Sequence, residues 1–202
     1  MTSKQVNVDS AFLIFNLPEY QYLTYYDDYQ NRLTQLTNQL IHYRLMRSNE
    51  LLETPYNNTL SYIGIPNVAD NKRVYSLAVN HKNGQASSAT TFLAQEVAKI
   101  QQFGFTEEEF LAQKELFAPQ VRLPDHKYNN SLNIAYLALA SSFHNMVNIS
   151  PSKSTQLGDS FLSNVTLEEV NQFATEVLVK PQFCAFYMGA SGFVNTDKII
   201  AD

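Results

Sequence analysis

The sequence predicts an α+β domain in which several helices pack on one face of a mostly antiparallel sheet. Three observations predict this class. Short apolar stretches with strand character lie near both ends of the chain and as a pair in its first half, and stretches with helical periodicity lie between them. The 202 residues include 45% hydrophobic and 16% charged side chains, which is a globular composition. We therefore expect residues 1–202 to form a single domain with one sizeable core.

The first predicted elements are a strand and a long helix. Residues 5–17 contain the bounded apolar run AFLIF and are followed by Pro18, which is typical of a strand. Apolar residues then recur at helical spacing, at Tyr29, Leu33, Leu36, Leu40 and Tyr43. This stripe predicts a helix with one buried face.

A hairpin and a further series of helices follow. Residues 59–65 and 73–79 are predicted strands, and the connection PNVADNK has a length typical of a hairpin. The next helix is expected to bury a face made of Phe92 or Leu93, Val97, Ile100 and Phe103. Another helix is predicted within residues 123–147, with Leu132, Leu139 and Phe143 on one face, and a shorter one after Pro151. The apolar run QFCAFYMGA, near the C-terminal end, is a predicted strand.

Two acidic clusters, at residues 107–109 and 168–169, suggest metal ligands, an acid/base pair or helix starts. Their surroundings favour helix starts. Gly104 lies just past the preceding helix, Thr106 is placed as an N-cap and Glu109 is the third residue of the new helix, which is the S/T-x-x-E capping box. The same pattern recurs in VTLEEV, residues 165–170.

Residue chemistry identifies no catalytic machinery. The four histidines, His42, His81, His126 and His144, form no pair at zinc-binding spacing. His42 is expected at the surface or its boundary and His81 in a turn. The single cysteine, Cys184, lies in an apolar run and is expected to be a buried core residue. Six glycines occur, and none forms a phosphate-binding loop.

Charge and hydropathy restrict the partners. The net charge is −5 and no block of lysines or arginines occurs, so the sequence predicts no nucleic-acid partner. No segment reaches the about 18–20 continuous apolar residues of a membrane span, so none is predicted.

Three segments together carry a resemblance to a known family. They are DDYQNRLTQLTNQLIHYRLMRSNELLETPY (27–56), FLAQEVAKIQQFGFTEEEFLAQKELF (92–117) and VTLEEVNQFATEVL (165–178). In this order they resemble the non-catalytic homologous domain of the pitrilysin/insulinase-like zinc metallopeptidases, a LuxS/processing-peptidase-like α+β domain. The resemblance covers nearly all of residues 5–190, and its middle segment is the most specific.

The resemblance has a direct implication for the metal. Catalytic members of this family hold zinc with an H-x-x-E-H helix and a downstream glutamate, and the first glutamate acts as general base. That motif does not occur in this sequence. We therefore expect no cofactor in this chain and zinc in a partner catalytic domain, so that this chain is inactive alone.

The resemblance also suggests substrate-binding residues. In many relatives the partner half contributes an arginine and a tyrosine, seven residues apart, that contact the substrate. Tyr56 matches the tyrosine, but Asn49 stands seven residues before it, and Arg44 and Arg47 are out of register. The implied candidates are Tyr56, as a hydrogen-bond donor to a developing oxyanion, and Arg47. The alternative is a turn or core role for Tyr56 and a solvated Arg47.

Further implications concern the role and the setting of the chain. We expect a catalytically silent partner domain that closes a chamber and helps hold extended peptide substrate against a zinc-bearing half. Alternatives are a structural or interaction module of the same fold without substrate contact, or an autonomous enzyme with distant histidine ligands.

The family's proteins are longer, so residues 1–202 are expected to be an excised C-terminal inactive domain whose partners are a zinc-bearing domain or subunit, peptide substrate and, for the isolated domain, a second copy. Pro119 is expected to interrupt its helix. Bacterial relatives are often periplasmic or envelope-associated, which points to the periplasm or cell envelope.

Overall fold

The computed structural model describes residues 9–17, 23–67, 72–82, 84–122, 149–178 and 184–188, together with residues 131, 132, 135, 138, 139 and 142. In chain order the elements are β1 (Asp9–Leu17), α1 (Tyr25–Glu50), β2 (Asn58–Asn67), β3 (Lys72–His81), α2 (Ala86–Phe103), α3 (Glu107–Arg122), α6 (Pro151–Asn164), α7 (Leu167–Leu178) and β4 (Cys184–Met188). The predicted hairpin strands, the helix after Pro151 and the last strand are confirmed within these bounds.

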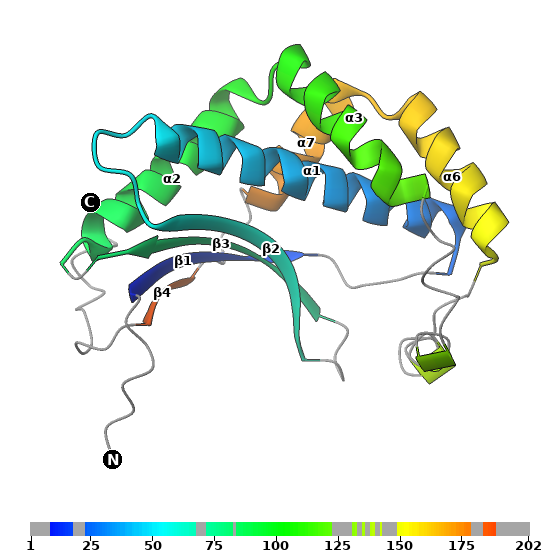
Figure 1. Ribbon diagram of the computed structural model, residues 1–202, viewed down its shortest axis with the longest axis horizontal. Coiled ribbons are helices and arrows are strands. Elements are labelled where there is room, and N and C mark those ends of the chain that lie inside the picture. The colour runs from blue at the N-terminus through cyan, green and yellow to red at the C-terminus, as the bar shows by residue number, and fades with distance from the viewer. Residues whose placement is uncertain are drawn as a thin grey trace.

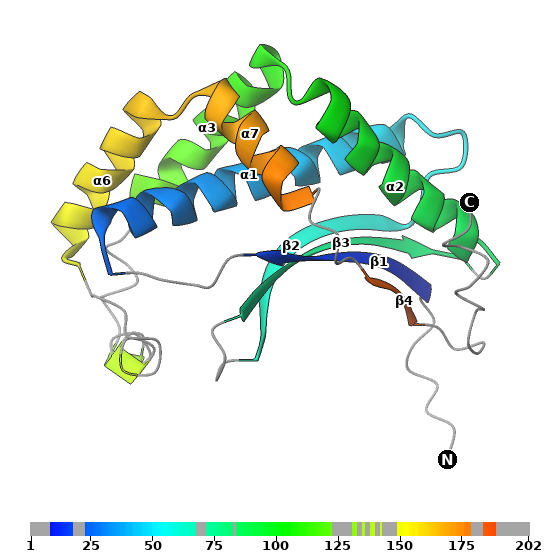
Figure 2. The same cartoon turned by 180° about the vertical axis from the view of Figure 1, so that it is seen from behind.

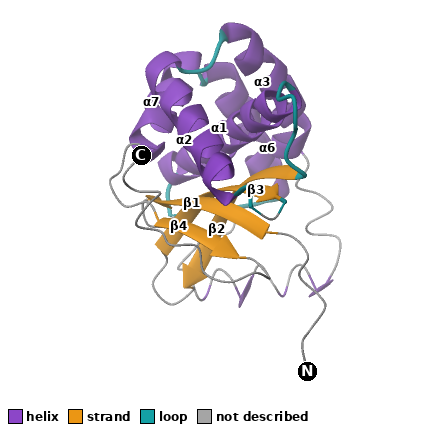
Figure 3. Cartoon of the chain, turned by 90° about the vertical axis from the view of Figure 1, so that its left-hand side faces the viewer, coloured by secondary structure: helices purple, strands orange, loops and turns teal. Residues whose placement is uncertain are grey.

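The described strands form one antiparallel sheet of four strands in the order β2-β3-β1-β4. The helices cover one face of this sheet, with α1 running along it and α3 and α6 lying further out (Figure 1). The view from behind shows α2 and α7 beside α1 over the same face (Figure 2), and the end view separates the helical layer from the sheet (Figure 3). The predicted α+β class with helices on one face is confirmed.

The central strands supply the sheet side of the core. Leu13 of β1 pairs with Leu77 of β3, and Phe15 pairs with Tyr75, so that large apolar side chains stand opposite one another on the face below the helices. All four are at most 4% exposed. Such alternation buries one face of each strand and fixes the register, because a shift of one residue would turn these side chains to the opposite face.

The long helix α1 carries the predicted apolar stripe. Leu33, Leu36 and Leu40 are buried, and Tyr29 packs partly buried against the core. Tyr43, predicted to continue the stripe, is only half-buried, whereas Leu45 is fully buried. The reason is that α1 lies between the sheet and the outer helices, so apolar contact occurs on more than one of its sides.

Both predicted capping boxes are present. The Glu109 N–H donates to Thr106 Oγ1 at 3.3 Å, and the Thr106 N–H donates to Glu109 Oε2 at 2.9 Å. At the second helix start the matching distances, between Thr166 and Glu169, are 3.2 and 2.9 Å. Each acidic cluster therefore begins a helix, α3 or α7, and satisfies backbone N–H groups that have no partner within the helix.

Pro119 does not end its helix, which is a correction to the sequence prediction. The helix α3 runs through Pro119 to Arg122. A proline fixes a φ angle that a helix accepts and removes one backbone hydrogen bond. Here Phe117 and Val121, on either side of it, are buried in the core, and this packing holds the last turn together.

Phe103 is a second correction. It was predicted on the buried face of α2, but its side chain is 72% exposed, whereas Ile100 is 1% exposed. Phe103 is the last residue of α2 and precedes the turn at Gly104, so the helix has passed the edge of the core there.

The predicted helix within residues 123–147 falls mostly outside the described residues. Of its predicted face, Leu132 and Leu139 are described, and both are exposed, at 64% and 59%. The expected burial of Cys184 concerns a side chain outside the described part of the structure.

The turn between α2 and α3 predicts a mutational effect. Gly104 has φ 65° and ψ −161°, a region that only glycine adopts readily. A Cβ at this position would lie 2.7 Å from the Asn171 side-chain amide, which accepts a 2.7 Å hydrogen bond from the Phe105 N–H. Gly104→Ala should therefore lower the free energy of unfolding by about 2–4 kcal/mol, measured by urea denaturation.

Gly84→Ala is the matched control. Gly84 also has a positive φ of 84°, but apart from its chain neighbours no atom of the described residues lies within 4 Å of the added Cβ. It should cost only backbone strain, about 1 kcal/mol. Equal losses in the two variants would show that the contact with Asn171 contributes nothing.

Candidate functional site

Tyr56, the first predicted substrate-binding residue, lies in the connection from α1 to β2. Its backbone is held by the Asn49 side chain, which accepts a 2.8 Å hydrogen bond from the Tyr56 N–H and donates a 3.1 Å hydrogen bond to the Tyr56 carbonyl. The ring packs against Phe92 of α2, with ring centroids 5.5 Å apart. The ring is partly buried against the core. Asn49 thus positions Tyr56 from the place where the resemblance implied an arginine.

Arg47, the second predicted residue, lies on the exposed side of α1. Its Nη1 donates a 2.8 Å hydrogen bond to the hydroxyl of Tyr43, one turn earlier. Together with Met46 and Glu50, these two residues line a shallow surface hollow of about 250 Å³.

The structure does not bring Arg47 and Tyr56 together. Residues two apart on a helix project in nearly opposite directions. Because Asn49 points toward Tyr56, Arg47 points away from it. Contact of either residue with a substrate stays a prediction.

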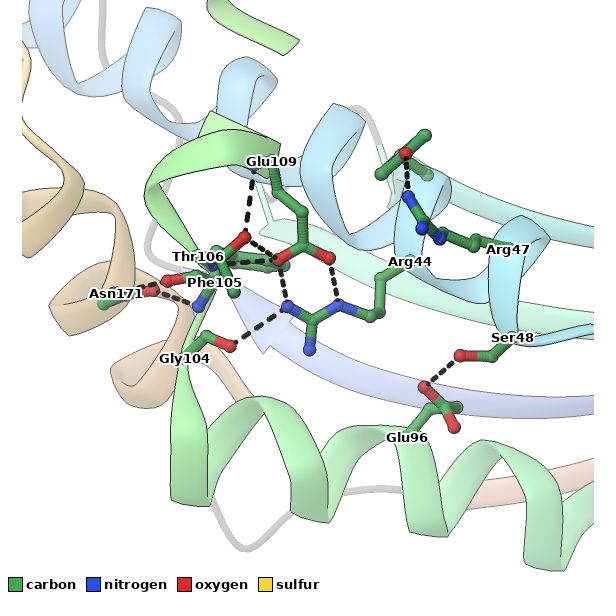
Figure 4. A network of polar contacts seen from close by, with 10 residues as sticks. Arg44, Arg47, Ser48, Glu96, Gly104, Phe105, Thr106, Glu109 and Asn171 are labelled. Carbon is green, nitrogen blue, oxygen red and sulfur yellow. Dashed lines mark hydrogen bonds and ion pairs between the residues drawn. The ribbon is translucent and has the colours of Figure 1, made fainter. Parts of the chain in front are cut away.

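Arg44, also considered out of register, has a structural role that the sequence did not reveal (Figure 4). It forms an ion pair with Glu109 through two hydrogen bonds, one of them 2.7 Å from Nε to Oε1. Its Nη2 also donates to the Gly104 carbonyl at 3.1 Å, and the guanidinium lies 5.2 Å from the centroid of the Phe105 ring. One arginine of α1 therefore holds both the α2–α3 turn and the start of α3.

The pKa of Glu109 reflects this setting. Burial by itself raises the pKa of the carboxyl group. The hydrogen bonds from Arg44 and Thr106 and the charge of Arg44 outweigh that effect, so the pKa is lowered from its ordinary value. Glu109 is therefore a charged structural group at neutral pH.

The second capping glutamate is used in the same way. The hydroxyl of Tyr29 on α1 lies 3.1 Å from both carboxylate oxygens of Glu169. Burial, the hydrogen bond to Glu169 and the charge of that carboxylate raise the pKa of Tyr29 to about 12. In each acidic cluster the capping glutamate, Glu109 or Glu169, is therefore engaged in structural hydrogen bonds.

A further buried carboxylate is also structural. Glu96 of α2 is 1% exposed, accepts a 2.8 Å hydrogen bond from the hydroxyl of Ser48 and forms a 2.6 Å ion pair with Lys99. Both of its oxygens are thus occupied, and the Ser48 contact joins α2 to the C-terminal half of α1 (Figure 4).

The described residues contain no group of three or more His, Cys, Asp or Glu side chains that could hold a metal ion. His42 is half-buried, as predicted, and burial lowers its pKa. His81 is not in a turn but is the last residue of β3, 3% exposed, with Nδ1 2.8 Å from the Lys82 carbonyl. The prediction was wrong because β3 extends two residues further than the apolar run. His126 and His144 lie outside the described residues.

The fold is shared with solved peptidase structures. The chain matches a predicted insulinase-family protease from Yersinia pestis with a TM-score of 0.81 and 18% identity, over 98% of this chain and 43% of that one. It matches the first half of the periplasmic protease PqqL from Escherichia coli with a TM-score of 0.81 and 20% identity, over 100% and 44% of the two chains. The inactive peptidase domain of a zinc protease from Bordetella parapertussis matches with a TM-score of 0.63 and 10% identity, over 95% and 100%.

These likenesses confirm the predicted resemblance at the level of the fold. The chain has the fold of the insulinase-family, M16-like zinc protease domains, including one that is inactive. It spans less than half the length of the first two structures. No protein-family profile and no curated protein sequence matches it.

The Arg44–Glu109 pair predicts a pH-dependent stability. The ionised Glu109 stabilises the fold fully above the ordinary glutamate pKa of 4.5, and this contribution is lost as the pH falls through the lowered pKa of the folded state. Glu109→Gln should therefore reduce the free energy of unfolding by about 1–3 kcal/mol at neutral pH. The difference between the two proteins should shrink in denaturation curves recorded below pH 4.5.

Glu107→Gln is the control for this measurement, since Glu107 is an exposed glutamate of the same first turn. It should change stability much less. A Glu109→Gln deficit that stays constant into strong acid would contradict a charged role for Glu109.

The Asn49 contact makes a separate prediction. Asn49→Ala removes both hydrogen bonds to the Tyr56 backbone and should lower the free energy of unfolding by about 1–3 kcal/mol. Amide hydrogen exchange should speed up selectively at Tyr56. Asn164→Ala is the control, because Asn164 is exposed and, among the described residues, its side chain bonds only to Ser160 of its own helix. Unchanged exchange at Tyr56 would contradict the positioning role of Asn49.

Proposed function

We propose that this chain is a catalytically silent partner domain of a zinc peptidase. Its role is to close a chamber with a separate zinc-bearing half and to help hold an extended peptide substrate against the metal. A partner domain needs the fold of the family without its metal ligands, and this chain combines the two.

The proposal rests on one combination: the chain has the fold of a zinc protease domain, and its sequence lacks the zinc-binding motif. The backbone matches zinc protease domains over 98–100% of its length, whereas H-x-x-E-H is missing from all 202 residues. A solved domain that is itself an inactive peptidase domain is matched over 95% of this chain. Zinc in such a system belongs to the other half, and the carboxylates of Glu109 and Glu169 serve the fold through their contacts with α1.

The greater length of the similar structures supports the presence of a partner domain. The first half of PqqL and the Yersinia pestis protease are each more than twice as long as this chain. The complementary half of the chamber would be supplied by another domain of the same fold, within one longer chain or as a separate subunit. The isolated domain would expose the surface that this partner covers and could pair with a second copy through it.

The same comparison supports a proposed compartment. PqqL is described as a periplasmic protease, and we place this chain in the periplasm or cell envelope on that basis. In the part of the chain that the structure describes, every helix is too short or too polar to cross a bilayer.

A second candidate function is a structural module of this fold without substrate contact. It is favoured by the residue that stands seven places before Tyr56, because Asn49 holds the Tyr56 backbone there instead of presenting an arginine. The two candidates differ in whether the Tyr56 hydroxyl takes part in peptide hydrolysis.

The experiment mixes the purified chain with an H-x-x-E-H-bearing insulinase-family domain from the same genome and follows cleavage of a fluorogenic casein peptide. The chain should raise the cleavage rate, and Tyr56→Phe should reduce that stimulation by roughly tenfold or more, since a hydroxyl that stabilises an oxyanion is lost. Tyr26→Phe is the control, because Tyr26 is 69% exposed in the first turn of α1, at the opposite end of that helix from Arg47.

Two other outcomes of this experiment would point away from a substrate-binding partner domain. Stimulation that Tyr56→Phe leaves unchanged would favour the structural module over substrate contact. No stimulation by the unaltered chain would contradict the partner role.

A further inference from the structure

An open groove of about 710 Å³ lies along the helical layer, between the C-terminal end of α2 and the exposed side of α7. These two helices contact each other and lie side by side in the view from behind (Figure 2). The groove has room for several residues of a polypeptide, since sites of about 300–1,000 Å³ hold medium-sized ligands. Tyr56 and Arg47 are not among its lining residues.

An exposed aromatic ring marks one end of the groove. Phe103 lines it and is 72% exposed. An aromatic ring left in water at the end of a helix gives up the free energy of burial. Leu167, at the start of α7, adds a half-buried apolar side chain to the same lining. The groove therefore offers an apolar contact beside its polar rim.

The rim is negatively charged. Glu168 and Glu176 line the groove, and the lining residues that the structure describes include no lysine or arginine. The Glu168 carboxylate accepts no hydrogen bond from a described residue. Glu176 uses one oxygen, which accepts a 3.1 Å hydrogen bond from the Gln172 amide. Carboxylate oxygens thus remain for a donor from outside.

The hydrogen-bond donors that line the groove instead bond to acceptors within the chain. The Gln101 amide donates to the Leu178 carbonyl at 3.2 Å, and the Thr175 hydroxyl donates to the Asn171 carbonyl at 2.9 Å. The Asn171 amide is held by the Phe105 backbone. What the groove presents is a ring and an excess of acceptors, which complements a flat, cationic donor.

We propose that this groove binds an arginine-bearing segment of a partner polypeptide. One guanidinium stacks on the Phe103 ring, and the arginines of the segment donate to the carboxylates of Glu168 and Glu176, which lie about 12 Å apart along α7. Apolar neighbours in the segment cover Leu167. Arginine fits better than lysine, because its planar group both stacks on aromatic rings and makes paired hydrogen bonds with carboxylates. A second copy of this chain fits less well, since both copies carry a net charge of −5.

The test uses a capped pentapeptide of alternating leucine and arginine, titrated into the isotope-labelled full chain and followed by amide NMR. Resonances of residues 101–104 and 167–176 should shift, and added salt should weaken binding. The same peptide with citrulline, the uncharged analogue of arginine, should bind at least about tenfold more weakly. The titration needs no peptidase partner, so its result is independent of the proposed function.

Variants locate the site. The double change Glu168→Gln and Glu176→Gln should weaken binding about tenfold, and Phe103→Ala about threefold or more. The controls are the double change Glu107→Gln and Glu108→Gln, which removes the same charge from the exposed first turn of α3, and Leu111→Ala, which removes an exposed apolar side chain outside the groove. Both should leave the affinity within about twofold.

The proposal is overturned if the groove resonances do not shift at millimolar peptide. It is also overturned if the citrulline peptide binds equally, or if the control variants weaken binding as much as the groove variants. Sedimentation of the unliganded chain must show no dimer that Phe103→Ala dissociates, because such a dimer would assign the groove to a second copy.

Discussion

The fold depends on the way α1 holds the starts of the two helices that follow acidic clusters. Glu109 caps α3 and at the same time pairs with Arg44, while Glu169 caps α7 and receives the Tyr29 hydroxyl. Each carboxylate therefore performs a local and a long-range task. Because α1 lies directly on the sheet, these contacts fix α3 and α7 relative to the strands. The turn at Gly104 is closed by the same network, through Asn171 of α7.

This use of acidic residues has consequences for function. Carboxylates that cap helices and hold an arginine or a tyrosine are poor candidates for metal binding or proton transfer, because their lone pairs are occupied and, for Glu109, the pKa is lowered. The chain keeps the architecture of a peptidase domain, while Glu96, Glu109 and Glu169 are engaged in structural contacts. We therefore propose that its function lies in two surfaces, the region of Tyr56 and the groove between α2 and α7, which would face different partners.

Much of the fold could be predicted because its signals are local. Capping boxes, the apolar stripe of α1 and the alternation of the strands each occupy a few neighbouring residues. Contacts across the chain left no such signal: Arg44 and Glu109 are 65 residues apart, and neither is unusual for a helix. The same holds for the site. The spacing of Asn49 and Tyr56 was visible, but the two hydrogen bonds between them depend on how the chain turns after α1. Pro119 and Phe103 were misjudged because tertiary packing, rather than local propensity, decides where those helices end and which side is buried.

We propose that this chain has the fold of a zinc peptidase domain without the metal chemistry of the family. The most direct measurement is the zinc content of the purified chain by mass spectrometry, with hydrolysis of an unfolded peptide recorded on the same sample with and without a chelator. Our account predicts less than stoichiometric zinc and no cleavage that the chelator abolishes. One zinc per chain together with chelator-sensitive cleavage would contradict it and would require ligands drawn from distant histidines.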